Sequence, residues 1–368
     1  KHLRYAGFND AIHVGVIGTG SRGSGMIPLL NEIQGLTVVA CCDVLPEQLA
    51  KGLKRTDGTV RSYTDYRKLL DDKDIDAILV ATPFNMHAPI ALDALGAAKH
   101  IYCEKTMAKG YADINRLLKK ANDTAVIFQT GHQYHSSRLY THVVELIKRG
   151  KIGQIAAIEC QWNRNGDWRR SVSNPIREKA INWRMYREFS GGLLAELCSH
   201  QLDFTNWVLD AVPLKVYGDG GVDYWKDGRE TFDNIHMIYT YPNGVRAKFT
   251  CLTSNAKDDY LIQVFGDQGT ITMDYAEAWL YPEAKTKVKK LGDVDGVAGA
   301  SMKWEAEKGI PIEVEHIDPT KQALIDFRDC IYHNTKPKSN VITGAHTAIC
   351  VQMGLDAMYQ EKIVPWPG

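Results

Sequence analysis

The feature that most constrains this chain is a short glycine loop between an apolar run and a helical pattern. The run is IHVGVIG (12–18), and the helical pattern begins at about residue 23. Glycines in this order allow a tight turn and let backbone N–H groups at the helix N-terminus approach a pyrophosphate. The motif therefore predicts a dinucleotide site at Gly18, Gly20, Ser21, Arg22 and Gly23.

The pattern around this loop alternates short apolar runs with helical periods. Continuous apolar runs separated by helices are typical of a parallel sheet covered on both faces. We therefore expect a doubly wound α/β domain over residues 1–132. The expected strands are 12–18, 36–42, 75–82, 100–104 and 125–130, with helices at about 23–33, 46–54, 64–71, 87–98 and 110–122.

Beyond a helix at about 136–149 the pattern changes to consecutive extended runs, which indicate a mostly antiparallel sheet with one open face. We expect residues 133–368 to form a second α/β domain for substrate and self-association, as a homodimer or homotetramer. An open face would otherwise expose a large apolar patch. The runs are 152–162, 216–225, 232–241, 245–254, 259–266 and 269–275; helices are expected at 191–207, 320–333 and 342–361, and a loop at 283–310.

Composition excludes several classes of partner. The chain has 368 residues, more than one core usually serves, and 44 basic residues balance 44 acidic ones, which argues against nucleic acid or an anionic membrane. No apolar run approaches the roughly 20 residues of a spanning helix. The eight cysteines are expected to be core residues. They lack CxxC spacing, so no metal is expected. A cytoplasmic location is favoured, and an exported one stays open because the chain starts at Lys1 without Met.

Asp43 ends the second expected strand, twenty residues after Gly23. A carboxylate at this place accepts hydrogen bonds from the adenosine ribose and repels a 2′-phosphate. No basic residue follows until Lys51. The sequence therefore favours NAD over NADP, with Arg22 as the one feature that could suit the extra phosphate.

Two further motifs end neighbouring strands, and a third group lies on the 191–207 helix. Thr82-Pro83-Phe84-Asn85-Met86-His87 follows one strand and Glu104-Lys105 the next. On the helix, Glu196, His200 and Asp203 have the spacing of one face. Ligands bind at the carboxyl ends of such strands, so chemistry is favoured over a core role for His200.

Together, these motifs and the glycine loop resemble the Gfo/Idh/MocA oxidoreductase family over nearly the whole chain. The resemblance implies hydride transfer between a sugar or polyol carbon and nicotinamide, with Lys105, Glu196 and His200 as catalytic residues. It extends the cofactor site to Thr82, Asn85, His87, Glu104 and Lys105. Two departures stand out: Thr106 replaces the usual Pro, so a trans link to Lys105 is an option, and Glu196 replaces the usual Asp.

The chemistry of these residue types agrees with that implication. A histidine tuned near neutral pH can take a hydroxyl proton, and an ammonium can stabilise an alkoxide. Glu196 or Asp203 would hold the other imidazole nitrogen. His87 either lines the pocket or only starts a helix. The aromatic and basic residues between 162 and 186 suit either a carbohydrate or a subunit interface. Substrate candidates are Tyr134, Trp162, Asn163, Trp183, Arg184 and Asp203.

Three functions are compatible with these features. The leading one is an NAD-dependent dehydrogenase of a sugar, glycoside or polyol. The second is an NAD-dependent glycosidase that oxidises a ring carbon, eliminates the aglycone, adds water and reduces the ring again. The third is an NAD-binding redox sensor without turnover, which the presence of Lys105 and His200 disfavours.

Overall fold

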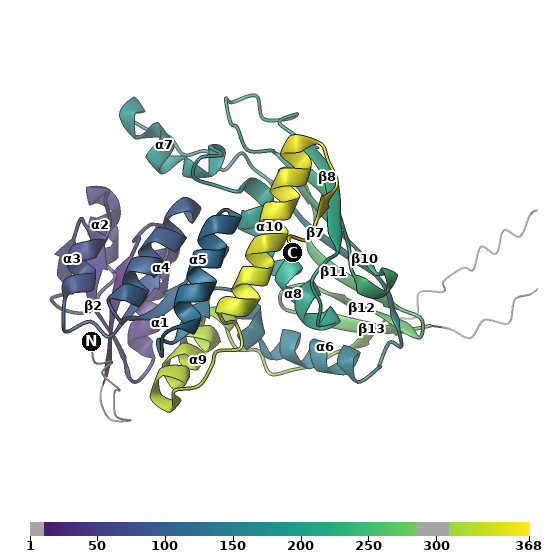
Figure 1. Ribbon diagram of the computed structural model, residues 1–368, viewed down its shortest axis with the longest axis horizontal. Helices are drawn as coiled ribbons and strands as arrows, with labels where there is room; N and C mark the ends of the chain where they lie inside the picture. The colour runs from purple at the N-terminus through teal and green to yellow at the C-terminus, as the bar shows by residue number, and fades with distance from the viewer. Residues whose placement is uncertain (1–10, 284–308) are drawn as a thin grey trace, which may run out of the picture.

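The chain folds around two sheets, which lie on opposite sides of a central group of helices (Figure 1). The computed structural model describes residues 11–283 and 309–368. Most of the loop expected at 283–310 therefore lies outside the described residues. Within the described residues, no helix is long and apolar enough to cross a membrane.

The first sheet is parallel and has six strands in the order β3-β2-β1-β4-β5-β6. This is the doubly wound order in which the chain reverses direction between β1 and β4, and a dinucleotide binds at that point. The strands are β1 (Ile12–Ile17), β2 (Leu36–Cys42), β3 (Arg61–Tyr63), β4 (Ala77–Val80), β5 (His100–Cys103) and β6 (Phe128–Thr130).

Five helices connect these strands at the places that the sequence pattern predicts. They are α1 (Ser21–Glu32), α2 (Pro46–Leu53), α3 (Tyr66–Asp71), α4 (His87–Gly96) and α5 (Tyr111–Asn122). The α/β fold of this half is confirmed. The edge strand β3 was not predicted, because its three residues are not buried and lack an apolar run.

The second sheet has nine strands in the order β14-β13-β12-β11-β7-β10-β9-β8-β15. β10 pairs parallel with β7, and the remaining pairings among the described residues are antiparallel, as expected. Its strands are β7 (Ile155–Asn165), β8 (Lys215–Gly221), β9 (Asn234–Thr240), β10 (Arg246–Leu252), β11 (Ser254–Gly266), β12 (Gly269–Met273), β13 (Ala278–Pro282), β14 (Ile310–Pro311) and β15 (Val364–Pro365).

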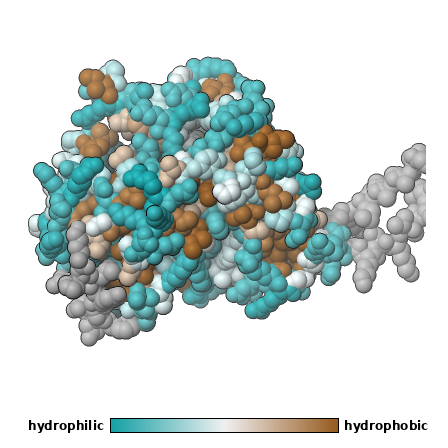
Figure 2. All heavy atoms as spheres, viewed as in Figure 1, coloured by the Kyte–Doolittle hydropathy of each residue, from teal (hydrophilic) through white to brown (hydrophobic). Residues whose placement is uncertain are grey.

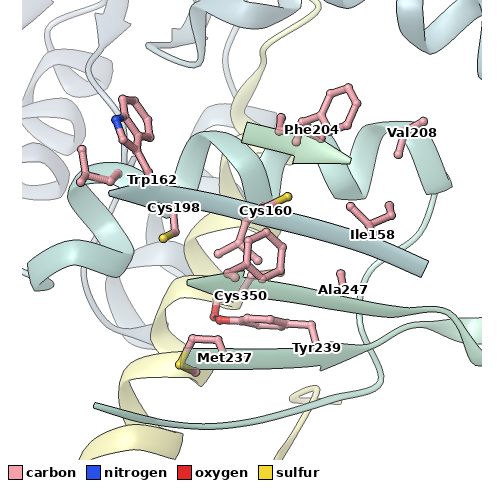
Figure 3. Close-up of a cluster of buried hydrophobic side chains, with 14 of the residues drawn as sticks. Ile158, Cys160, Trp162, Cys198, Phe204, Val208, Met237, Tyr239, Ala247 and Cys350 are labelled. Atoms are coloured by element: carbon pink, nitrogen blue, oxygen red, sulfur yellow. The ribbon is translucent and has the colours of Figure 1, made fainter. Parts of the chain in front are cut away.

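Helices cover one face of this sheet, and no helix of the described residues covers the other. Along β10 the buried residues alternate with exposed Arg246 and Lys248, which is the pattern of a half-covered strand. The covering helices are α6 (Arg138–Lys148), α8 (Ser199–Leu209) and α10 (Val341–Gln360). Side chains from β7, β9, β10, α8 and α10 interdigitate in the core between them (Figure 3).

Two C-terminal helices join the halves of the molecule. α10 packs against α5 of the first half and against α8 and β8 of the second. α9 (Pro319–His333) buries Leu324 and Phe327 in the core beneath the first sheet. Contacts of the last sixty residues therefore cross the boundary expected near residue 132.

The cysteines are core residues, as expected. All eight are free and buried, and Cys160, Cys198 and Cys350 lie in the core of the second half (Figure 3). On the face shown in Figure 2, apolar side chains form small separate groups among hydrophilic ones.

Candidate active site

The glycine loop has the geometry that a dinucleotide needs. Gly18 has φ +89°, and a Cβ there would lie 2.6 Å from the carbonyl oxygen of Ala81. A Cβ on Gly23 would lie 1.9 Å from the carbonyl oxygen of Gly18, so both positions require glycine. A Cβ on Gly20 would meet nothing within 4 Å. The loop is thus packed against β4 on one side and open at Gly20, over the N-terminus of α1.

Asp43 follows β2 and fixes the loop from the side. Its Oδ2 accepts the Thr19 N–H at 2.8 Å, and its Oδ1 accepts the Leu45 N–H at 2.9 Å. Burial raises the pKa of this carboxyl, and the two N–H groups oppose the rise. Each oxygen keeps a lone pair for a further donor. Asp43 can therefore hold the loop and still accept two hydroxyls.

Charged side chains near the start of α1 divide into two groups. Ser21 Oγ is contacted by Lys51 Nζ at 3.5 Å and by Arg170 Nη2 at 3.3 Å. Arg22 instead donates through Nε to Glu104 Oε1 at 2.6 Å. The sequence motif predicted Arg22 as part of the dinucleotide site; in the structure its guanidinium pairs with the Glu104 carboxylate, and Lys51 and Arg170 contact Ser21 at the start of α1. Arg170 belongs to the second half, so spacing along the chain gave no signal for it.

The segment after β4 contributes two polar atoms without a partner in the described part of the chain. Thr82 Oγ1 and Asn85 Oδ1 are buried and make no hydrogen bond within the described part of the chain. Buried polar atoms are normally paired. Next to a glycine loop of this geometry, such atoms fit a bound nucleotide. The residues present therefore fit NAD.

His87, the first residue of α4, supports the site from beneath. Its Nδ1 lies 2.8 Å from the carbonyl oxygen of Thr106, and its Nε2 lies 2.9 Å from that of Thr82. The imidazole thus links the segments that follow β4 and β5. Both of its nitrogens are used in these backbone contacts, so His87 has a structural role here rather than lining a pocket.

Lys105 follows β5 and reaches the second half of the molecule. Its Nζ donates to the carbonyl oxygen of Glu196 at 2.6 Å. Burial lowers the pKa of Lys105, and the carboxylates of Glu196 and Glu104 oppose the change. The bond from Lys105 to Thr106 is cis, so the option of a trans link was wrong. Thr106 Oγ1 donates to the Ala195 carbonyl oxygen at 3.2 Å, which anchors this residue on the same segment.

The segment that carries Glu196 is not the continuous α-helix that the spacing indicated. Leu194–Cys198 forms a π-helical turn, and α8 begins only at Ser199. Glu196 is therefore placed by the π turn and not by the regular spacing of α8. Its carboxylate instead accepts the Arg184 Nε–H at 2.7 Å. Burial alone would raise the pKa of Glu196, but Arg184 and Lys105 hold it below its ordinary value.

His200 lies among aromatic rings. Its ring is 5.1 Å from that of Tyr134 and 5.8 Å from those of Trp162 and His132, centroid to centroid. Burial lowers the pKa of His200 well below its ordinary value, and Lys105 and His132 add to the effect. Its Nδ1 is buried without a partner among the described residues. His200 is thus a neutral imidazole with an unused nitrogen.

Asp203 does not serve His200. Its Oδ2 lies 2.8 Å from His135 Nε2, its Oδ1 accepts the Thr347 hydroxyl at 3.1 Å, and His132 Nδ1 lies 3.9 Å from Oδ1. Burial would raise the pKa of Asp203, but the two histidines hold it below its ordinary value. The expectation that Glu196 or Asp203 orients His200 was wrong, because both carboxylates have other partners. His132, a residue that the sequence analysis missed, occupies the place between Asp203 and His200.

The other substrate candidates lie in three different places. Tyr134 and Trp162 border His200, and the buried Nε1 of Trp162 has no partner in the described chain. Trp183 lies under the Arg184 guanidinium, with the carbon Cζ 4.3 Å from the ring centroid. Asn163 instead bridges β-strands, since its amide donates to the Lys257 carbonyl oxygen and its oxygen accepts the Leu252 N–H. Asn163 therefore has a sheet role in this structure.

Comparison with protein families identifies both halves of the chain. Residues 12–132 match the oxidoreductase family with an NAD-binding Rossmann fold, and residues 140–272 match the GFO/IDH/MocA C-terminal domain. The chain belongs to the Gfo/Idh/MocA family of NAD-binding oxidoreductases.

Individual relatives agree with this family. Myo-inositol 2-dehydrogenase of Thermotoga maritima is 25% identical over 72% of this chain and 75% of its own length. The 2,7-anhydro-N-acetylneuraminate hydratase of Mediterraneibacter gnavus is 29% identical over 71% of this chain and 67% of its own. Among solved structures, levoglucosan dehydrogenase in complex with NADH and levoglucosan has a TM-score of 0.77 at 18% identity, covering 98% of this chain and 100% of that one. Aldose-aldose oxidoreductase from Caulobacter crescentus has a TM-score of 0.77 at 18% identity, covering 96% and 99%.

Proposed function

We propose that this protein is an NAD-dependent dehydrogenase of a sugar, glycoside or polyol. The observation that carries the proposal is the meeting of Lys105, from a strand end of the first half, with the π turn that precedes His200. An ammonium and a neutral imidazole then lie near each other, since the charge of Lys105 acts on the pKa of His200. The named relatives act on inositol and on anhydro sugars, which supports a polyhydroxylated substrate.

The residues have separate tasks in this reaction. NAD, when bound, supplies the hydride acceptor. Lys105 holds the hydroxyl that is oxidised and stabilises its oxygen as the proton leaves. His200 takes that proton, which a neutral imidazole can accept. Glu196, paired with Arg184, favours the charged form of Lys105 through its field, against the effect of burial. Tyr134 and Trp162 present ring faces to the sugar.

The cofactor preference and the assembly belong to the same proposal. The two free lone pairs of Asp43 favour a ribose with both hydroxyls, hence NAD over NADP. The half-covered second sheet, with partly buried Ile238 and Phe265 on its open side, supports association through that face into a dimer or tetramer.

A second candidate is net hydrolysis or hydration by transient oxidation. The relatives named 2,7-anhydro-N-acetylneuraminate hydratase support it. A glycoside oxidised at a ring carbon loses its aglycone by elimination, water adds, and the stored hydride returns to the ring, so that no reduced cofactor accumulates.

One experiment separates the two. The purified protein is first examined by mass spectrometry for bound nucleotide and then supplied with NAD and, separately, with myo-inositol, levoglucosan and aryl glycosides. Absorbance of reduced nicotinamide that rises with oxidised product supports the dehydrogenase. Aglycone release without such absorbance supports the second candidate. Lys105→Ala is the control, since it must abolish either signal.

A further inference from the structure

A histidine–carboxylate pair lies behind His200, where no role has yet been assigned. His132 follows β6, as Lys105 follows β5, so both come from carboxyl ends of neighbouring parallel strands. The side chain is 1% exposed. Its Nδ1 lies 3.5 Å from Thr130 Oγ1 and 3.9 Å from Asp203 Oδ1. The imidazole is thus directed with one nitrogen toward a buried carboxylate.

The rings of His132 and His200 lie next to each other. His132 Nε2 and His200 Nδ1 are both buried without a hydrogen-bond partner among residues 11–283 and 309–368. Their rings are perpendicular, with centroids 5.8 Å apart. Two neighbouring imidazoles therefore each keep one unused nitrogen, which is uncommon for buried polar atoms. Hydrogen bonds of this kind are often long before substrate binds and tighten afterwards.

The charges around the two rings differ. His200 has Lys105 and His132 nearby, which disfavour a positive imidazole. Burial lowers the pKa of His132, and His135 and Lys105 lower it further. The carboxylates of Asp203 and Glu104 raise it. A proton is therefore better accommodated on His132 than on His200.

Neither a metal site nor a purely structural role fits His132 as well. A metal site is not indicated, since no group of three His, Cys, Asp or Glu in the described residues has the geometry to hold an ion. A purely structural role suits His135 better than His132: His135 stacks on Trp207 at 4.3 Å and is 2.8 Å from Asp203. That arrangement makes His135 a matched control, because it shares Asp203.

We propose that His132 is a positioning residue that shares the proton taken by His200. This inference rests on the proposed function. His200 accepts the substrate hydroxyl proton on Nε2; its Nδ1–H bond breaks, and a new N–H bond forms on His132 Nε2. The resulting imidazolium lies against Asp203. No electron is transferred in this step, so it needs no further reactant.

The substrate-independent test is nitrogen NMR of the full-length protein labelled with ¹⁵N-histidine and loaded with NAD. The inference expects neutral His132 to carry its proton on Nδ1, beside Asp203, and to leave Nε2 free to accept. The signal is assigned by its loss in His132→Gln. Asp203→Asn should change the His132 signal. A proton found on Nε2, or a His132 signal that Asp203→Asn does not alter, would overturn the inference.

The kinetic test compares His132→Gln with His135→Gln on whichever of myo-inositol and levoglucosan is oxidised. His132→Gln should lower kcat on the order of 10²-fold, the lower end for proton transfer, with little change in KM. It should also move the acidic limb of the kcat profile to lower pH, since His200 alone is the weaker base. His135→Gln should keep that limb in place. Equal profiles for the two variants would overturn the inference, whereas absence of any oxidation by the unaltered protein would count against the proposed function and leave the NMR result to judge His132.

Discussion

Replacing Asp43 by Ala tests how the cofactor is chosen. The carboxylate offers about four lone-pair sites. The N–H groups of Thr19 and Leu45 use two of them. Thr19 Oγ1 also lies 3.4 Å from Oδ2, but it donates its single proton to the Gln48 carbonyl oxygen at 2.8 Å. Two lone pairs, one on each oxygen, therefore remain for the two hydroxyls of the adenosine ribose.

The magnitude follows from that count. A hydrogen bond to a charged group contributes about 1.5 kcal/mol at the lower end of its range, so two contribute about 3 kcal/mol, which is about 100-fold in affinity. NADP carries a phosphate in place of one hydroxyl and is repelled by Asp43, so it gains from the change. The loss of support for the Thr19 and Leu45 N–H groups affects both nucleotides equally. The ratio of the two dissociation constants isolates the ribose contribution.

The assay is a fluorescence titration of the protein with NADH and with NADPH, with melting temperatures recorded without nucleotide. Glu47→Ala is the control, because it removes one charge from neighbouring α2, where Glu47 pairs with exposed Arg177. We expect the preference for NADH to fall at least about 100-fold in Asp43→Ala and to stay unchanged in Glu47→Ala. An equal loss for both nucleotides, or tighter NADPH binding by the unaltered protein, would refute the reasoning.

Three further outcomes are expected. Lys105→Ala and His200→Ala should each lose about 10²–10⁴ in turnover yet bind NADH within a few-fold of the unaltered protein by fluorescence; full turnover in either would remove it from the mechanism. Burial lowers the pKa of His100 to about 4. The free energy of unfolding should therefore fall by about 3 kcal/mol as the pH falls from about 6.5, the unfolded pKa, to about 4. In His100→Asn, whose side-chain oxygen can accept the Ile127 N–H, urea unfolding should show a smaller fall over the same pH range. Ile238→Asp, on the open sheet face, should reduce the mass measured by light scattering to that of one protomer, and a monomeric unaltered protein would contradict association.

Most of the first sheet could be predicted because parallel strands are buried on both faces and leave continuous apolar runs in the sequence. The runs that became β1, β2, β4, β5 and β6 have this character. β3, β14 and β15 are edge strands of two or three residues, with exposed or half-exposed side chains in each. Their pairing depends on a neighbouring strand rather than on a local pattern, and none was predicted.

The helix of Glu196 and His200 shows where spacing stops being sufficient. Four residues apart means one face only if every turn is α-helical. The π turn at Leu194–Cys198 instead leaves the carbonyl oxygens of Ala195 and Glu196 to accept bonds from Thr106 and Lys105, about ninety residues earlier. A local pattern holds no information about donors that distant. The sequence therefore predicted that Glu196, His200 and Asp203 belong to the site, but it did not predict which residues they contact.

His132 was missed for the same reason: its partner is distant in the sequence. Its sequence surroundings, Gly131 and Gln133, give no periodicity or motif that points to Asp203, seventy-one residues later. The fold brings Asp203 of α8 to 3.9 Å from the His132 imidazole, which follows β6. Because Asp203 is paired there, His200 has no carboxylate partner among the described residues and lies near the Lys105 ammonium, as a neutral and weakly basic group. Such an imidazole can take a proton during the reaction but has little to stabilise the charge, so an acceptor paired with a carboxylate immediately behind it completes the chemistry.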